Sequence, residues 1–265
     1  MSSIAVLGAG VMGETLLAGL LRAGKLPHEL VVAERRSERA AELTERYGVK
    51  VVGNAEAAAV ADTLVLVVKP QDMAALLAEI YDHVREGGLV VSLAAGITTT
   101  FLEERLRPGT AVVRVMPNTP ALVDEGMSAV SPGSSCDETH LEQAEHLMGA
   151  VGRVLRVPEQ QQDAVTAISG SGPAYVFFVV ESMIEAGVHL GLPRTTATQL
   201  AVQTAFGSAK MLRETGQHPT VLREQVTSPG GTTAAALREL ERHGVRAAFL
   251  AALEAARDRS KELGN

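Results

Sequence analysis

Short apolar runs alternate with segments of helical periodicity from the N-terminus to residue 157. The runs have strand length and lie at residues 4–7, 30–33, 49–52, 63–68, 89–93 and 111–116, with further candidates at 126–130 and 152–157. Between them, apolar residues recur at the spacing of one helix face. Strands that alternate with helices indicate an α/β fold with a parallel, doubly wound sheet. Nearly continuous apolar runs such as 63–68 are typical of strands covered on both faces.

The pattern changes near Pro158, and no later segment resembles a strand. The first later helix is apolar nearly all round, so more than one of its faces must be covered. We predict an α/β domain over residues 1–158 and an all-α domain over 159–265. Glycine and proline breaks in the second domain delimit helices that we expect at about 173–190, 194–214, 219–227, 234–243 and 245–263.

Three glycines follow the first apolar run at the spacing G-x-G-x-x-G and precede a helical pattern. Gly8 would make the tight turn, Gly10 would let a pyrophosphate approach the backbone, and Gly13 would let the helix pack on the strand. The phosphates would then face free N–H groups at the positive end of the helix dipole. The predicted cofactor-binding residues of this loop are Gly8, Gly10, Val11, Met12 and Gly13.

The end of the second run carries opposing signals about the cofactor. Glu34 lies about twenty residues past the glycines, where an acidic residue binds the ribose of NAD. Arg35 and Arg36 supply the opposite chemistry, because arginine pairs with a 2′-phosphate through charge-assisted bonds. Open α/β sheets bind ligands at the carboxyl ends of their strands. The other predicted cofactor contacts follow later runs and are Asn54, Val68, Lys69, Pro70, Ala94, Ala95 and Gly96.

Composition narrows the class of protein further. The chain has 265 residues, 46% of them hydrophobic, so it can bury the core of one or two domains. The net charge of −7, without a block of like charges, argues against nucleic acid or an anionic membrane as partner. The single Cys136 excludes an internal disulfide and fits a reducing compartment. The N-terminus has no basic region before its apolar run, so we expect a cytoplasmic protein.

Two further classes of site are not expected. The longest apolar runs, such as 174–180, are too short to span a bilayer. The seven histidines show no metal-ligand spacing, so no metal site is predicted.

Two glycine-rich segments of the helical half lie directly before predicted helices. One covers residues 169–175 and includes Ser171, which we expect to cap a helix whose first turn contains Pro173. The other covers residues 228–233, and its Thr232 or Thr233 can cap the helix expected to start near Ala234. Backbone N–H groups in such a loop can bind a small anion.

Over nearly its whole length the sequence resembles the pyrroline-5-carboxylate reductases. The resemblance is carried by residues 8–13, Val68-Lys69-Pro70, Ala94-Ala95-Gly96, residues 116–120 (Met-Pro-Asn-Thr-Pro) and both glycine-rich segments, with residues 226–233 the most diagnostic. It implies a Rossmann-like N-terminal domain followed by an all-α dimerisation domain. It further implies reduction of pyrroline-5-carboxylate to proline, the last step of proline biosynthesis, by an intertwined homodimer that is often assembled into larger rings.

The resemblance also sets expectations for the site. It favours NADPH, with NADH as a usable second cofactor. The expected substrate-binding residues are Ser228, Gly230, Gly231, Thr232 and Thr233. The N–H groups of Gly231 and Thr232 are expected to hold the substrate carboxylate. By resemblance, the Thr233 hydroxyl would hydrogen-bond the ring nitrogen and help to protonate it, or would only orient the ring while solvent supplies the proton. The alternative is that Thr233 only caps a helix.

Two other functions remain compatible with the sequence. A β-hydroxyacid dehydrogenase also pairs a dinucleotide fold with a helical domain, but needs a general acid or base, usually lysine, on the helical half. Lys210 is the one candidate before Lys261, and its amphipathic helix suggests a solvated residue. A non-catalytic module that senses the cofactor is the other alternative.

Overall fold

The computed structural model describes residues 3–264, which form two compact units. The first comprises residues 3–171 together with 256–264, and the second comprises residues 172–255. The predicted boundary at residue 158 therefore precedes the point where the two units divide, and the last residues of the chain return to the first unit.

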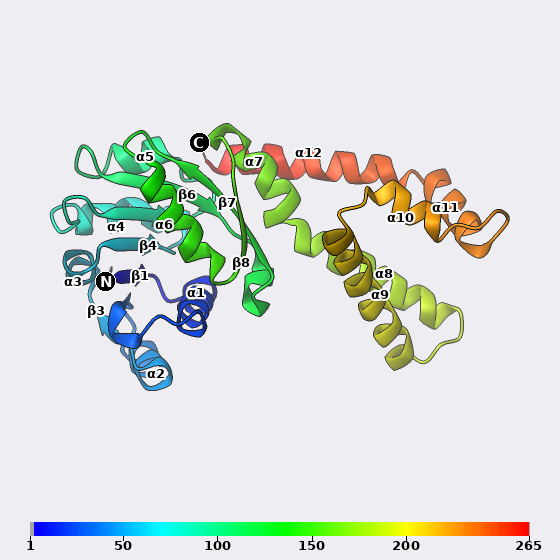
Figure 1. The fold of residues 1–265 in the computed structure, drawn as a ribbon, viewed down its shortest axis with the longest axis horizontal. Helices are drawn as coiled ribbons and strands as arrows, with labels where there is room; N and C mark the ends of the chain where they lie inside the picture. The colour runs from blue at the N-terminus through cyan, green and yellow to red at the C-terminus, as the bar shows by residue number, and fades with distance from the viewer. Residues whose placement is uncertain (1–2, 265) are drawn as a thin grey trace. The chain divides into compact units, whose positions relative to one another are not determined.

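The first unit is built around one sheet, to which residues 3–264 contribute eight strands in the order β3-β2-β1-β4-β5-β6-β7-β8 (Figure 1). Their bounds are β1 (Ile4–Leu7), β2 (Leu30–Ala33), β3 (Lys50–Val52), β4 (Thr63–Leu66), β5 (Leu89–Ser92), β6 (Ala111–Met116), β7 (Gly126–Pro132) and β8 (Gly152–Arg156). Strands β1 to β6 are parallel, as predicted.

Strand β7 runs antiparallel to β6, which corrects the expectation of a wholly parallel sheet. The physical reason is the short link between the two strands, which holds only the 3₁₀ helix η3 (Thr119–Val123). A parallel crossover needs a dozen or more residues, usually with a helix.

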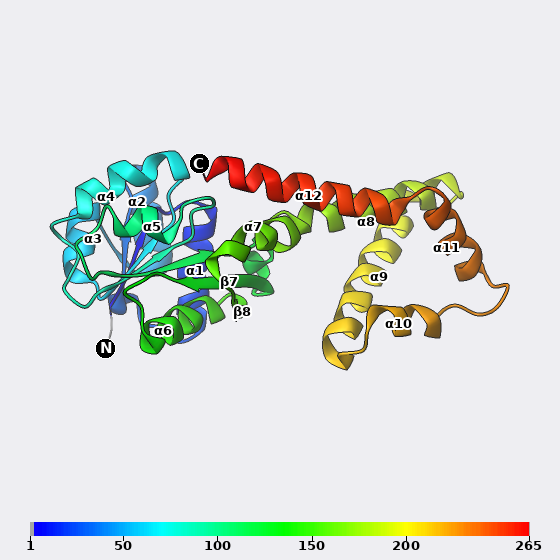
Figure 2. The same cartoon turned by 90° about the horizontal axis from the view of Figure 1, so that it is seen from above.

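Helices cover both faces of this sheet (Figure 2). One face packs against α1 (Val11–Arg22), α2 (Ser37–Tyr47) and α6 (Glu138–Gly149), and the other against α3 (Asn54–Val60), α4 (Met73–Ile80) and α5 (Thr99–Glu103). Side chains of β1 alternate between the two layers, since Ile4 joins the first core while Ala5 and Leu7 join the second. The predicted doubly wound architecture is therefore confirmed.

All regular secondary structure in the described residues of the second unit is helical. It contains α8 (Gly172–His189), α9 (Arg194–Thr215), α10 (Pro219–Gln225), α11 (Thr232–Arg242) and most of α12 (Val245–Leu263). Helix α8 packs on α9, where Gly187 meets the methyl group of Ala197. No residue of α8 is buried in this single chain, and Phe177 and Phe178 are 66% and 69% exposed.

The chain enters α8 through an unbroken helical run that begins at Glu159. It passes through η4 (Glu159–Gln161), α7 (Gln162–Val165) and a π-helical turn, η5 (Thr166–Gly170). Ser171 lies between η5 and α8 with αR backbone angles (φ −85°, ψ −17°) rather than the extended ones of a helix N-cap, and its N–H donates to the Thr166 carbonyl at 2.8 Å, so the expectation that Ser171 caps a new helix was wrong. Pro173 has no N–H to donate to the preceding turn, and a widened π turn is one way to accommodate such a residue.

The same run corrects the expectation about membrane length. The apolar stretch 174–180 is short, but the helix that contains it, Glu159–His189, is long and apolar enough to cross a bilayer, with a mean hydropathy of 1.3. Only 6% of its most apolar window is buried within the chain, so its apolar surface needs a cover.

Candidate functional site

The glycine loop after β1 has the geometry that the spacing predicts. Gly8 has φ +107°, and a Cβ there would lie 2.7 Å from the Val67 carbonyl oxygen. A Cβ on Gly13 would collide with the Gly8 carbonyl oxygen, so α1 packs directly on the loop. A Cβ on Gly10 would meet nothing within 4 Å, which leaves open space beside the backbone. The loop lies between β1 and β4, where the strand order reverses and dinucleotides bind.

The first turn of α1 faces this space with its backbone N–H groups. Gly10 is the N-cap, and the first intrahelical bond runs from the Glu14 N–H to the Gly10 carbonyl at 2.9 Å. The N–H groups of Val11, Met12 and Gly13 consequently have no acceptor within the helix. Three converging donors at the positive end of a helix dipole suit a pyrophosphate.

Glu14 lies in the same turn, but its charge is offset by side chains from α2. Its carboxylate accepts hydrogen bonds from Tyr47 at 2.8 Å, from Arg46 at 2.9 Å and from Arg39. Burial raises the pKa of Glu14, but the hydrogen bonds from Tyr47 and Arg39 outweigh it and hold the pKa below its usual range. These contacts also join α2, which starts beside Arg35 and Arg36, to the phosphate-facing helix.

Glu34 and Arg36 form a closed pair at the end of β2. The two Glu34 oxygens accept from Arg36 Nε and Nη2, both at 3.1 Å, and Oε1 also accepts the Arg36 N–H at 2.9 Å. The side chain of Glu34 is 9% exposed, whereas that of Arg36 is 70% exposed. The Arg36 guanidinium holds the pKa of Glu34 below its usual range. Glu34 is therefore less available to a ribose than the sequence suggested.

Arg35 has a different partner, Glu79 on α4. Arg35 Nη2 lies 3.3 Å from Glu79 Oε2, and the same oxygen accepts the Asn54 Nδ2 donor at 2.9 Å. Asn54 is 8% exposed and Arg35 is 76% exposed in its side chain. Sequence reasoning missed Glu79, because nothing in the spacing of an exposed helix glutamate points to residues 44 and 25 positions away.

The remaining predicted cofactor contacts follow β4 and β5, at the same edge of the sheet. Lys69 and Pro70 are exposed after β4, while Ala94 and Gly96 are buried after β5. Gly96 has φ +77°, and a Cβ there would lie 3.1 Å from the Leu263 carbonyl oxygen. The small size of Gly96 thus makes room for the end of α12 within this unit.

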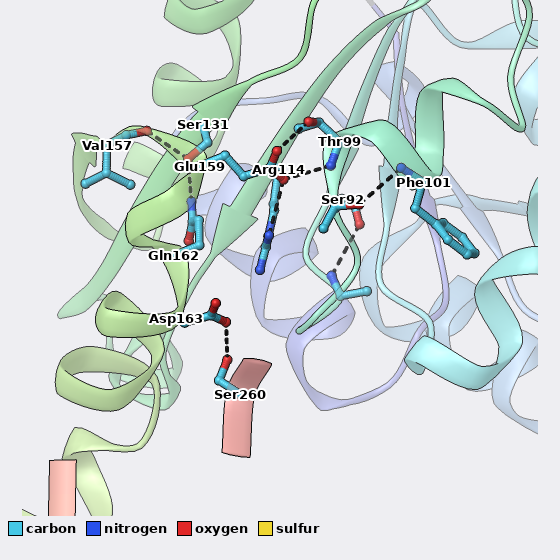
Figure 3. Close-up of polar contacts among 12 residues, drawn as sticks. Ser92, Thr99, Phe101, Arg114, Ser131, Val157, Glu159, Gln162, Asp163 and Ser260 are labelled. Atoms are coloured by element: carbon cyan, nitrogen blue, oxygen red, sulfur yellow. Dashed lines mark hydrogen bonds and ion pairs between the residues drawn. The ribbon is translucent and has the colours of Figure 1, made fainter. Parts of the chain in front are cut away.

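Beside these loops, a buried ion pair connects the sheet to the start of the long helical run (Figure 3). Arg114 of β6 is 6% exposed, and its Nη1 lies 3.2 Å from Glu159 Oε1. The Glu159 carboxylate also accepts the Thr99 N–H at 2.8 Å and the Thr99 hydroxyl at 2.6 Å. One turn later, Asp163 accepts the hydroxyl of Ser260, which lies on α12, at 2.7 Å.

Two motifs of the sequence, residues 116–120 and 169–175, are linked within this unit through Asn118 and Ser169. Asn118 Oδ1 accepts the Met127 N–H at 2.8 Å, so its Nδ2 faces Ser169 and donates to Oγ at 3.1 Å. The Ser169 hydroxyl keeps its own proton to donate. Neither residue was among the predicted site residues, although Asn118 follows β6 closely at the ligand-binding edge, which is a usable signal.

The segment 228–233 belongs to the second unit, and the cofactor set belongs to the first. Helix α11 begins at Thr232 with Gly231 as its N-cap and no side-chain capping bond. The expectations that α11 starts near Ala234 and that Thr232 or Thr233 caps it were therefore wrong, because extended Gly231 follows the left-handed Gly230 (φ +70°).

The turn also corrects the assignment of one donor. The Gly231 N–H donates to the Ser228 carbonyl at 3.0 Å, so it is occupied within the loop. The first helical N–H groups, those of Thr232 and Thr233, have no acceptor within the helix. In this unit Lys210 is exposed and lies 3.6 Å from Glu214, an arrangement typical of a surface ion pair.

Known proteins resemble the chain over its full length. Residues 159–263 match the family model described as pyrroline-5-carboxylate reductase dimerisation, and residues 3–96 match the one described as NADP oxidoreductase, coenzyme F420-dependent. A pyrroline-5-carboxylate reductase of Corynebacterium melassecola is 50% identical, covering 100% of this chain and 99% of that protein.

Two solved structures share the fold as well as the sequence. The pyrroline-5-carboxylate reductase of Coxiella burnetii aligns with a TM-score of 0.95 at 39% identity, over 100% of this chain and 99% of that one. The pyrroline carboxylate reductase of Plasmodium falciparum, solved with NADP bound, aligns with a TM-score of 0.89 at 31% identity, over 100% and 98% of the chains.

Proposed function

The chain belongs to the pyrroline-5-carboxylate reductase family and is an oxidoreductase that reduces the cyclic imine 1-pyrroline-5-carboxylate to L-proline, the last step of proline biosynthesis; from this premise we propose which residues bind its cofactor and its substrate. The reaction adds a hydride to the imine carbon and a proton to the ring nitrogen. A bound nicotinamide cofactor supplies the hydride. The chain must therefore orient the ring, hold its carboxylate and satisfy its nitrogen.

The cofactor site comprises the glycine loop, the end of β2 and the loops after β4 and β5. The open space at Gly10 and the free N–H groups of the first turn of α1 suit a pyrophosphate. NADPH is the preferred cofactor and NADH a usable second one, because Arg36 engages Glu34 and both Arg35 and Arg36 are exposed. The NADP-bound structure of the Plasmodium falciparum relative supports this choice.

Replacing both arginines tests the preference. Arg35→Ala with Arg36→Ala should lower kcat/KM for NADPH about tenfold or more, because a hydrogen bond to a charged group contributes roughly 1.5–3 kcal/mol. The value for NADH should change little. Arg85→Ala removes another exposed arginine, which pairs with Asp62, and serves as the control. An NADPH-to-NADH ratio that is 1, or that the double variant leaves unchanged, contradicts the assignment.

The substrate site is the segment from Ser228 to Thr233. The substrate carboxylate binds the free N–H groups of Thr232 and Thr233, where donors and helix dipole coincide, and Gly230 and Gly231 allow close backbone approach. The Thr233 hydroxyl binds the ring nitrogen and holds a proton there. The observation that supports this role is that Gly231, not Thr233, is the N-cap of α11, so the Thr233 hydroxyl is not used to cap the helix.

The variant Thr233→Ala tests the catalytic role. We expect kcat to fall by at least roughly tenfold, a cautious floor for a positioned proton donor. NADPH affinity and Tm should stay within error, because no capping bond is lost. Thr198→Ala, which removes a hydroxyl bonded within α9, is the matched control. An unchanged kcat together with a lower Tm would instead show that Thr233 has a structural role only.

The proposed assembly is a cytoplasmic homodimer. Several such dimers would form a larger ring in the native state. The match to the dimerisation family, residues 159–263, includes the exposed apolar helical run from Glu159 to His189. The proposed partner of that apolar surface is therefore a second copy of the chain rather than a membrane. The single Cys136 is half-buried with its pKa raised by burial, which agrees with an unreactive thiol in a reducing compartment.

A further inference from the structure

Glu79 on α4 forms an ion pair with Arg35, whose positive charge the proposed cofactor site uses to bind a 2′-phosphate. Its Oε2 atom lies 3.3 Å from Arg35 Nη2, and this is an exposed contact, with 41% of the Glu79 side chain and 76% of the Arg35 side chain accessible. Exposed pairs of this kind contribute about 0.2–1 kcal/mol. A ligand phosphate can therefore displace Glu79 from Arg35, but only against that free energy.

The second contact of Glu79 fixes its position. Asn54 lies at the first turn of α3, is 8% exposed and donates Nδ2 to the same Oε2 at 2.9 Å. An amide beside a carboxylate must turn its NH₂ group toward it, so the orientation of Asn54 is settled by Glu79. The carboxylate is thus held between a buried amide and an exposed arginine, and its negative charge stays at the edge where Arg35 would meet a phosphate.

Arg36 is held more firmly than Arg35. It makes a two-point contact with Glu34 and a third bond through its backbone, and the Glu34 side chain is 9% exposed. Arg36 is accordingly held in place and presents its remaining donors, whereas Arg35 is held by one long bond. A single bond at 3.3 Å adds little preorganisation, so competition and like-charge repulsion dominate the effect of Glu79 on a 2′-phosphate.

We propose that Glu79 is a specificity-determining residue that weakens recognition of the 2′-phosphate by competing for Arg35, and so reduces the preference of the enzyme for NADPH over NADH. The proposal rests on the proposed cofactor site. Glu79→Gln removes the charge but keeps an oxygen that can accept from Asn54, so the fold is retained. It should tighten binding of a 2′-phosphorylated ligand and leave the affinity for nucleotides without a 2′-phosphate unchanged.

The test is calorimetric titration of the protein without cofactor, using adenosine 2′,5′-bisphosphate and ADP as probes. Glu79→Gln should lower the Kd of the bisphosphate about two- to fivefold, the ratio that corresponds to the loss of an exposed ion pair, and leave the Kd of ADP unchanged. In an Arg35→Ala background the gain should fall by at least half. The ratio of kcat/KM for NADPH to that for NADH should rise by the same factor. Glu56→Gln, which removes a carboxylate of α3 that pairs with Lys50, is the charge-matched control.

Each outcome has a defined meaning. An unchanged or weaker bisphosphate affinity overturns the proposal, and so does an equal change for ADP or an equal gain in the Arg35→Ala background. If the unaltered protein binds the bisphosphate no more tightly than ADP, the NADPH assignment fails by itself. A gain in Glu79→Gln would still support competition for Arg35 in that case.

Discussion

At the scale of single residues, Gly10 and Gly13 separate two roles that one sequence motif combines. A methyl group on Gly13 would collide with the Gly8 carbonyl, whereas one on Gly10 would touch no protein atom within 4 Å. Gly13 is thus needed for packing within the protein, whereas Gly10 leaves room for a ligand to approach the loop. Alanine at each position should therefore fail in a different way.

The two alanine variants make this difference measurable. Gly10→Ala should leave Tm within error and weaken NADPH binding at least about tenfold, because the added methyl occupies the space that the pyrophosphate needs. Gly13→Ala should lower stability by about 1–3 kcal/mol through overpacking and weaken NADPH binding as well. Thermal melts with and without NADPH check both. Equal Tm losses in the two variants would contradict the division of roles.

Residue-level chemistry was predictable where it follows chain order and not where it depends on tertiary contacts. The glycine spacing and Glu34 are local signals, and the structure gives the glycines the expected geometry. The Arg36 pairing that engages Glu34, and the Glu79 contact with Arg35, depend on rotamers and on helix packing across the sheet surface. No pattern of residue types determines which carboxylate an exposed arginine selects.

At the scale of elements, strands and helices were predictable because their periodicities persist over several residues. Junctions were harder. The break expected before Pro173 became a π turn inside one helical run, since the Ser171 N–H reaches back to Thr166. Helix α11 begins at Thr232 because the backbone of Gly230 and Gly231 forms the turn, so a glycine rather than a hydroxyl side chain precedes the helix. In both places backbone hydrogen bonds determined the outcome, and side-chain identity only constrained it.

At the scale of the whole molecule, the exposed apolar surface of the second unit predicts self-association. Light scattering at micromolar concentration should give at least twice the mass of one chain, because Phe177 and Phe178 on α8 are exposed in the single chain. Phe177→Asp with Phe178→Asp should shift the mass toward one chain. Leu26→Asp makes one such change at an exposed apolar position of the first unit and should leave the mass unchanged. A stable monomer of the unaltered protein would contradict the proposed homodimer.

The return of residues 256–264 to the first unit has a consequence for synthesis in the cell. Ser260 contacts Asp163, and Leu263 and Gly264 lie against Gly96, so a segment that follows the second unit in sequence completes the nucleotide-binding half. A ribosome releases the N-terminal residues first, yet that half lacks these contacts until residues 256–264 have left the ribosome. Residues 256–264 can add these contacts only after residues 172–255 have been synthesised, so a message truncated within the second unit yields a first unit without them.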